Sequence, residues 1–266
     1  MRLEPNPESL EQLARVLDLA KKNGLYLDIT GLGCYDKEDV PRWYNELSER
    51  PRWDVQARFW GAVARICSHS PAVFCYDLMN EPIVNEDKAN RDWTPGALGD
   101  RYFVQRLTLD FGGRTQKQIA KAWVDKLVAA IRKHDRQHLI TVGAIPWALT
   151  WPNAKPLFYS KEVSENLDFV SLHFYPKKGE VDKALQALAV YQIGKPIVIE
   201  EMFPLSCSIQ ELDQFIDGSR KVAAGWISFY WGKSIAEYRQ EKRTIADDMM
   251  LNWLEYFAKK TLGPTK

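Results

Sequence analysis

Short, strongly apolar segments alternate along this chain with longer segments of helical periodicity, and this alternation limits the folds the chain can adopt. The run 72–82, AVFCYDLMNEP, is apolar almost to its polar end, which is typical of a strand buried on both faces of a sheet. Leu10, Leu13 and Leu17 recur instead every three or four residues, as on one face of a helix. We predict strands at 25–30, 72–79, 138–143, 168–176, 195–201 and 225–231, and helices at 8–23, 52–68, 116–134, 181–192, 209–223 and 247–260.

Strands separated by helices imply a parallel sheet with helical crossovers, so the predicted fold class is α/β. The pattern alone fits both a closed (β/α)8 barrel and an open doubly wound sheet. No glycine-rich phosphate loop follows any predicted strand, which weakens the nucleotide-binding form of the open sheet. The sequence shows no repeat, linker or low-complexity tract, and we interpret residues 1–266 as a single domain.

The balance of charge excludes several classes of partner. The chain has 36 Lys and Arg against 35 Asp and Glu, so nothing favours binding to nucleic acid or to an anionic membrane. No apolar run is long enough to span a bilayer. We therefore expect an uncharged substrate, no nucleic acid and no membrane. The residues at the start show no signal peptide, and localisation and oligomeric state stay open.

The cysteines show neither a metal-binding nor a redox pattern. They form no CxxC pair and have no metal-like spacing with the histidines, so we interpret them as free and mostly buried. They are Cys34, Cys67, Cys75 and Cys207.

Polar side chains stand at the ends of several predicted strands. Working residues gather at the carboxyl ends of the strands in parallel α/β domains, so we expect these side chains to share one edge. Two carboxyls there, with an amide, an imidazole, a phenol and an indole, suit a retaining glycosidase, which needs one protonated and one ionised carboxyl about 5–5.5 Å apart. The residues are Asn80 and Glu81, His173 and Tyr175, Glu200 and Glu201, and Trp231.

Which acid of the Glu200–Glu201 pair faces the site is left open by the pattern. A period of two places Glu201 on the same strand face as Ile199, and Glu200 on the opposite face with Val198. Both faces are apolar, so parity does not choose between them. Structural explanations also stand beside the functional ones: Glu81 as a surface acid, His173 as a hydrogen-bonded core histidine and Trp231 as a cap on the core.

Taken together, these residues resemble glycoside hydrolase family 5, the cellulase and mannanase family of clan A retaining glycosidases. The likeness covers nearly the whole chain in the right order, and it is carried by Asn80-Glu81-Pro82, His173-x-Tyr175, the segment 195–201 (KPIVIEE) and Trp231. The resemblance implies a (β/α)8 TIM barrel in which the predicted strands are strands 3 to 8. Strands 1 and 2 would then precede Met1, and we expect an incomplete barrel, either a fragment or a reading frame begun at an internal Met.

The same resemblance implies a role for each residue and no metal or organic cofactor. Glu81 would be the acid/base, Glu201 the nucleophile, Asn80 a ligand of the sugar 2-hydroxyl, Tyr175 a hydrogen-bond donor to the nucleophile, His173 a residue lining the same subsite, and Trp231 the stacking platform. The chain departs from the family in two places. Met202-Phe203-Pro204 stands where an aromatic residue and a glycine are common, and residues 30–33 offer no histidine.

The function we predict is retaining hydrolysis of β-linked glucan or mannan-type oligo- and polysaccharides by double displacement, with a carbohydrate as the substrate. One alternative is a catalytically impaired barrel fragment that only binds carbohydrate. Another is an α/β enzyme of unrelated chemistry. Trp93, Trp147 and Trp151 lie in predicted loops and are either further sugar subsites or local packing residues.

Overall fold

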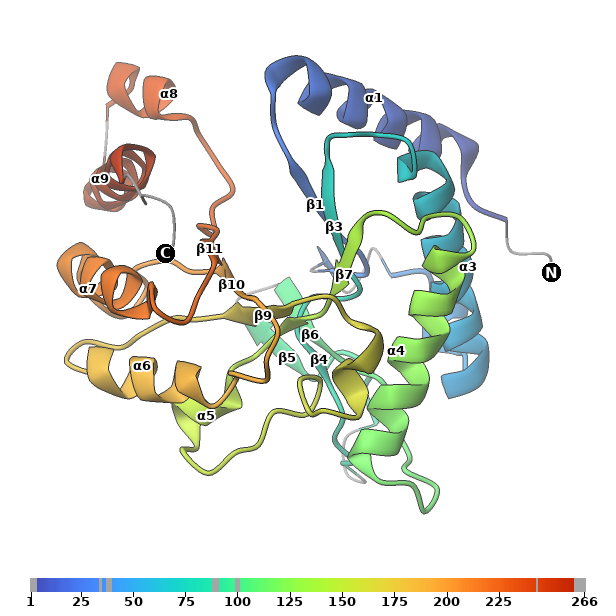
Figure 1. The fold of residues 1–266 in the computed structure, drawn as a ribbon. Coiled ribbons are helices and arrows are strands. Elements are labelled where there is room, and N and C mark those ends of the chain that lie inside the picture. Colours follow the sequence, from blue (N-terminus) through green and yellow to red (C-terminus); the bar gives the residue numbers. More distant parts are fainter. Residues whose placement is uncertain are drawn as a thin grey trace. The chain divides into compact units, whose positions relative to one another are not determined.

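Strands and helices alternate in the computed structural model much as the sequence pattern predicts (Figure 1). The structure describes residues 4–33, 35–36, 40–87, 91–98, 101–242 and 244–260. In chain order the elements are α1 (Pro7–Asn23), β1 (Leu27–Thr30), β2 (Tyr35–Asp36), α2 (Arg42–Asn45), α3 (Glu49–Cys67), β3 (Val73–Asp77), β4 (Pro82–Ile83), β5 (Gly96–Leu98), β6 (Arg101–Arg106), α4 (Gln116–Arg132), β7 (Leu139–Thr141), β8 (Gly143–Ala144), α5 (Trp147–Thr150), the 3-10 helix η2 (Val163–Asn166), β9 (Val170–His173), α6 (Val181–Ala189), β10 (Ile197–Glu201), α7 (Ile209–Ser219), β11 (Gly225–Trp226), α8 (Ile235–Gln240) and α9 (Ile245–Lys259).

These elements form two compact units. The first unit comprises Met1–Ile145 and Pro156–Val170. The second comprises Pro146–Lys155 and Ser171–Lys266.

The first unit is built on the parallel sheet β1-β3-β7. Its register sets Thr30 opposite Asp77, and Asp77 opposite Thr141, at the carboxyl ends of the strands. The loops that follow β1, β3 and β7 therefore leave the sheet at one edge. The helices α3 and α4 run side by side in Figure 1 and pack against each other.

Tryptophans form much of the core of this unit, and their polar atoms find partners. The indole nitrogen of Trp60 donates to the backbone oxygen of Leu78 at 3.1 Å. Trp123 donates to Oε1 of Gln56 at 2.8 Å, and Gln56 donates onward to the Tyr44 hydroxyl at 2.9 Å. Both indoles are fully buried, so these bonds meet the cost of taking N–H groups out of water.

A small second sheet lies in segments where the sequence pattern predicted no strand, so that prediction was incomplete. Strand β6 pairs antiparallel with β2 and β5 and parallel with β4. Three of these four strands have only two or three residues. Periodicity cannot reveal a strand so short, because its stability comes from cross-strand partners distant in the sequence.

The second unit contains the strand order β11-β10-β9, with β10 and β11 parallel. The strand predicted over 225–231 ends at Trp226, a correction to its length. The following backbone still tracks β10, because the Ile227 N–H donates to the Ile199 oxygen at 2.8 Å and the Phe229 N–H donates to the Met202 oxygen at 2.9 Å. Helices α6 and α7 pack side by side in this unit (Figure 1).

Three of the cysteines are thiols outside any disulfide, as predicted. Cys67 and Cys75 are buried and Cys207 is half-buried, whereas Cys34 lies outside the described residues. Among the helices that the structure describes, none combines the length and apolar character needed to cross a bilayer.

The chain that follows β1 approaches α3 closely at Gly31, so a larger residue there should destabilise the protein. A Cβ added there would overlap the Trp60 indole and lie 2.9 Å from Cε1 of Phe59. We expect Gly31→Ala to lower the free energy of unfolding by about 1–3 kcal/mol, because a packed core resists added volume. Denaturant unfolding of the variant measures the change.

Gly33→Ala is the matched control, since a Cβ at that position would meet its nearest atom, the Cβ of Asn80, only at 4.0 Å. Equal stability of the Gly31 and Gly33 variants would contradict this close packing of Gly31 against Trp60 and Phe59.

Candidate active site

Glu201 is the last residue of β10. Two side chains from the neighbouring segment, β9 and the residues that follow it, contact its carboxylate. The Tyr175 hydroxyl donates to Oε2 of Glu201 at 2.9 Å. Nδ1 of His173 lies 3.0 Å from the same oxygen. Strand β9 runs beside β10, and the Phe174 N–H donates to the Glu201 backbone oxygen at 2.8 Å. Two side chains at alternate positions therefore point to one carboxylate oxygen.

These contacts control the charge of Glu201. Burial by itself would raise the pKa of this carboxyl, because it disfavours the charged form. The hydrogen bond and positive charge of His173, together with the Tyr175 hydrogen bond, outweigh burial and hold the pKa of Glu201 below its ordinary value. The side chain is therefore a carboxylate at neutral pH.

Glu200, the preceding residue, contacts the same histidine from its other side. Its Oε2 accepts a hydrogen bond from Ser171 Oγ and lies 3.6 Å from Nε2 of His173. Both acids therefore reach His173, although strand parity suggested that only one would face the site. Tyr175 makes its hydrogen bond to Glu201 and distinguishes that acid from Glu200.

Asn80 and Glu81 lie in the first unit, directly after β3. Glu81 is buried and has a φ of 46°, in the left-handed region that residues with a side chain rarely adopt. The backbone is held there by the Glu81 N–H, which donates to the Gly143 oxygen at 2.9 Å, and by Nδ2 of Asn80, which donates to the Phe103 oxygen at 3.0 Å. Strained backbone of this kind clusters at functional sites.

Trp231 lies five residues after the end of β11, and its side chain is 96% exposed. The alternative that it caps the core is therefore wrong. Trp147 and Trp151 are stacked on each other at 5.1 Å and are partly exposed, whereas Trp93 is buried. Trp93 stacks on the guanidinium of Arg52 at 4.5 Å and is a packing residue.

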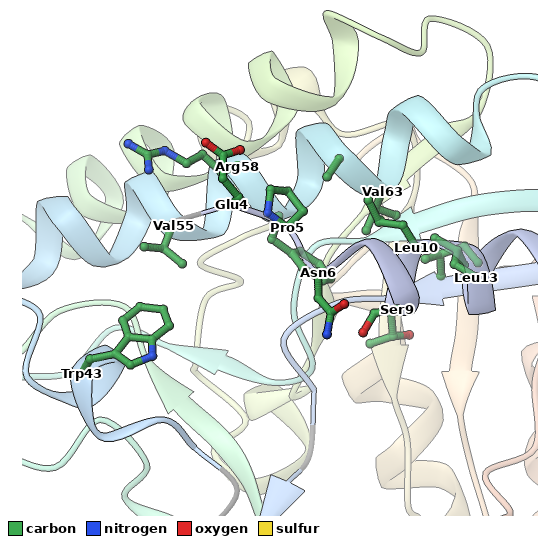
Figure 2. Close-up of a pocket in the computed structure, with 14 residues that line it drawn as sticks. Glu4, Pro5, Asn6, Ser9, Leu10, Leu13, Trp43, Val55, Arg58 and Val63 are labelled. Atoms are coloured by element: carbon green, nitrogen blue, oxygen red, sulfur yellow. The ribbon is translucent and has the colours of Figure 1, made fainter. Parts of the chain in front are cut away.

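A separate groove of about 510 Å³ lies in the first unit between α1, β1 and α3. Figure 2 shows Leu10 and Leu13 of α1 facing it with Val55 and Val63 of α3. Its lining is mainly apolar and includes none of the predicted site residues. The groove therefore adds nothing to the chemistry of the carboxylates.

Sequence reasoning missed the role of Ser171 and the contact of Glu200 with His173. The signal for Ser171 is the alternation Ser171-x-His173-x-Tyr175, which puts three polar side chains on one face of an otherwise apolar segment. Taken by itself, neither unit brings His, Cys, Asp or Glu ligand atoms of three described residues into a group suited to a metal ion.

Comparison with known proteins places the chain in a family. Residues 2–264 match the family described as Cellulase (glycosyl hydrolase family 5). The chain belongs to glycosyl hydrolase family 5. The match extends across both units, and a single domain over 1–266 stays a prediction.

Curated relatives agree with this family assignment. Mannan endo-1,4-beta-mannosidase A of Podospora anserina is 23% identical over 262 residues, 88% of this chain and 63% of that protein. Mannan endo-1,4-beta-mannosidase 5 of Arabidopsis thaliana is 27% identical over 121 residues, 41% of this chain and 22% of that protein. The chain thus spans less than two thirds of the length of these relatives.

Two solved endoglucanase structures have folds similar to that of this chain. The catalytic domain of Thermobifida fusca endoglucanase Cel5A has a TM-score of 0.58 at 17% identity, over 86% of this chain and 65% of that one. Pseudomonas stutzeri endoglucanase Cel5A has a TM-score of 0.57 at 19% identity, over 98% and 78%. The family and these structures confirm the predicted (β/α)8 TIM-barrel type of fold.

The contacts at Glu201 predict how its carboxyl responds to the loss of Tyr175. Replacing Tyr175 by Phe removes a donor to the ionised form, so the pKa of Glu201 should rise and its carboxylate should be protonated at a higher pH. Carbon-13 NMR of glutamate-labelled protein follows the titration, with Glu201→Gln to assign the signal.

Tyr26→Phe serves as the control, because Tyr26 is 78% exposed. An unchanged or lower pKa of Glu201 in the Tyr175 variant, with the control behaving as the parent, would count against the hydrogen bond as a cause.

Proposed function

We propose that this family 5 chain is a retaining β-glycoside hydrolase that cleaves β-linked glucan or mannan-type oligo- and polysaccharides by double displacement. One observation carries the proposal: Glu201 is held as a carboxylate at the end of β10 by His173 and Tyr175. Attack on an anomeric carbon requires an ionised carboxyl held in a defined orientation. Donors from two side chains on one oxygen supply both conditions.

Glu81 is the acid/base in this mechanism. In the first step the bond from the anomeric carbon to the leaving oxygen breaks, Glu81 protonates that oxygen, and Glu201 forms an ester with the sugar. In the second step water attacks the anomeric carbon, its proton passes to Glu81, and the electron pair of the ester bond returns to Glu201. The mechanism requires the two carboxyls to come within about 5–5.5 Å of each other.

Asn80 and Trp231 contact the sugar in this proposal. The bond from Nδ2 of Asn80 to the Phe103 oxygen orients the amide next to Glu81, where it can meet the sugar 2-hydroxyl. Trp231 has an almost fully exposed ring, and such a ring can stack on the apolar face of a sugar.

The family and the relatives support a substrate class. The curated relatives are named for mannan, and the Thermobifida fusca endoglucanase was also solved in complex with cellotetraose. We therefore propose a β-1,4-linked chain of glucose or mannose as the substrate. A panel of cello- and manno-oligosaccharides, with products separated by chromatography, tests both.

Removal of the nucleophile tests the mechanism directly. Glu201→Ala should lose hydrolysis by at least about 10⁴-fold and still bind a manno- or cello-oligosaccharide in calorimetry. In the parent protein, a 2-deoxy-2-fluoro glycoside should label the peptide that carries Glu201, as found by mass mapping.

Glu241→Gln is the control for this test, because Glu241 lies on the surface and pairs with Lys233. Turnover retained by Glu201→Ala, or a label on another peptide while turnover is intact, would contradict the assignment.

For a substrate with a good leaving group, removal of the acid/base should slow mainly the second step. We expect Glu81→Ala to lower kcat by about 10²–10⁴-fold on an activated aryl β-glycoside, because water then lacks its base. Azide needs no base, so it should restore turnover and yield a β-glycosyl azide. An α-linked product, or no recovery with azide while the variant is folded, would argue against retention through Glu81.

A second candidate function is carbohydrate binding without turnover. It is favoured by the exposed ring of Trp231, which can stack on a sugar whether or not the carboxyls react. Oligosaccharide binding by the parent protein, combined with no hydrolysis and no fluorosugar label, would establish this alternative.

A further inference from the structure

Two carboxylates flank one imidazole in the second unit. His173 lies between Glu201, whose Oε2 is 3.0 Å from Nδ1, and Glu200, whose Oε2 is 3.6 Å from Nε2. The side chain of His173 is only 3% exposed. Two carboxylates of β10, Glu200 and Glu201, therefore face a single ring of β9, that of His173, which can carry a positive charge.

The hydrogen-bonding capacity of these groups restricts the state of the ring. A carboxylate only accepts hydrogen bonds, and a neutral imidazole carries a proton on just one nitrogen. If Nε2 were unprotonated, its lone pair would face the negative oxygen of Glu200. With Glu200 ionised, attraction at both nitrogens requires both to be protonated, so the imidazolium is the form that fits this geometry.

Burial of Glu200 gives a second, independent argument. Its Oε2 accepts a hydrogen bond from Ser171, but its Oε1 is buried and finds no hydrogen-bond partner among the described residues. A buried carboxylate is costly unless a positive group compensates it. His173 is the basic side chain beside it in the second unit.

We propose that Glu200 is a positioning residue of the active site, which faces Nε2 and holds His173 doubly protonated so that the ring donates from Nδ1 to Glu201. Ser171 keeps the Glu200 carboxylate turned toward the ring. Among the described residues of this unit, Glu200 and Glu201 of β10 face His173, and Tyr175 joins them at Glu201. The inference deepens the proposed function and rests on it for its kinetic consequence.

A positive ring beside Glu201 acts most strongly when negative charge returns to that carboxylate. This happens in the second step, when water forms its bond to the anomeric carbon and the ester bond to Glu201 breaks. Removing the charge of Glu200 should let His173 become neutral. The carboxylate of Glu201 should then become a poorer leaving group.

Nitrogen-15 NMR of histidine-labelled protein tests the proposal without any need for turnover. The chain has four histidines, and His173→Gln identifies the signals of His173 by their loss. At neutral pH the parent protein should show both ring nitrogens of His173 protonated. In Glu200→Gln, which preserves the size of the side chain, one nitrogen should move to the unprotonated range.

Two further variants keep this measurement decisive. Ser171→Ala should move the His173 signals in the same direction by a smaller amount, and it provides the test if Glu200→Gln does not fold. Glu180→Gln, at a residue that pairs with Lys183 on the surface, should leave them unchanged. Signals of His173 that are identical in the parent, Glu200→Gln and Ser171→Ala would overturn the proposal.

Kinetics separate a positioning role from a merely structural one. On an activated aryl β-glycoside, Glu200→Gln should lower kcat by about 10- to 100-fold, by analogy with partners that orient metal-ligating histidines. KM should fall with kcat, because the glycosyl-enzyme accumulates. A loss confined to KM, or equal kcat for the parent and Glu200→Gln, would contradict the role. A parent protein that does not hydrolyse the substrate would refute the proposed function, and the nitrogen-15 spectra would still decide the state of His173.

Discussion

Parallel pairing of short buried strands is the constraint on which the rest of this structure depends. A parallel pair cannot be closed by a tight turn, so each strand requires a returning helix, and the carboxyl ends of neighbouring strands meet at a common edge. In the first unit this places the loops after Thr30, Asp77 and Thr141 together. In the second unit it places Glu201 at the end of β10, beside the chain that follows β9.

Negative charge is concentrated at the carboxyl end of β10, where Glu200 and Glu201 follow three apolar residues. Such a pair is unfavourable in a buried strand unless donors and a cation surround it. Ser171, His173 and Tyr175 provide these groups at alternate positions of the neighbouring segment. Their spacing of two residues matches the strand period, so one face of a single segment serves both carboxylates.

The main elements of the fold follow from local pattern, and the departures have physical causes. The helix from Gln116 was predictable because its apolar stripe and its Thr115 capping box lie within one segment. Strand β6 was not predictable, because its partners β2, β4 and β5 are very short and come from other parts of the chain. The strand after Gly225 was predicted too long, since the backbone beyond Trp226 follows β10 without regular strand geometry.

By itself the sequence determined the α/β class, the family and the identity of the candidate acids, because these depend on periodicity and on residue types in a set order. Tertiary structure decided which groups act on each acid. It showed the hydrogen bond from Tyr175 to Glu201 that the family resemblance implied, brought Glu200 to His173 against the expectation from parity, and placed Glu81 in a left-handed backbone conformation. Each of these depends on contacts between segments far apart in the chain, which local sequence does not encode.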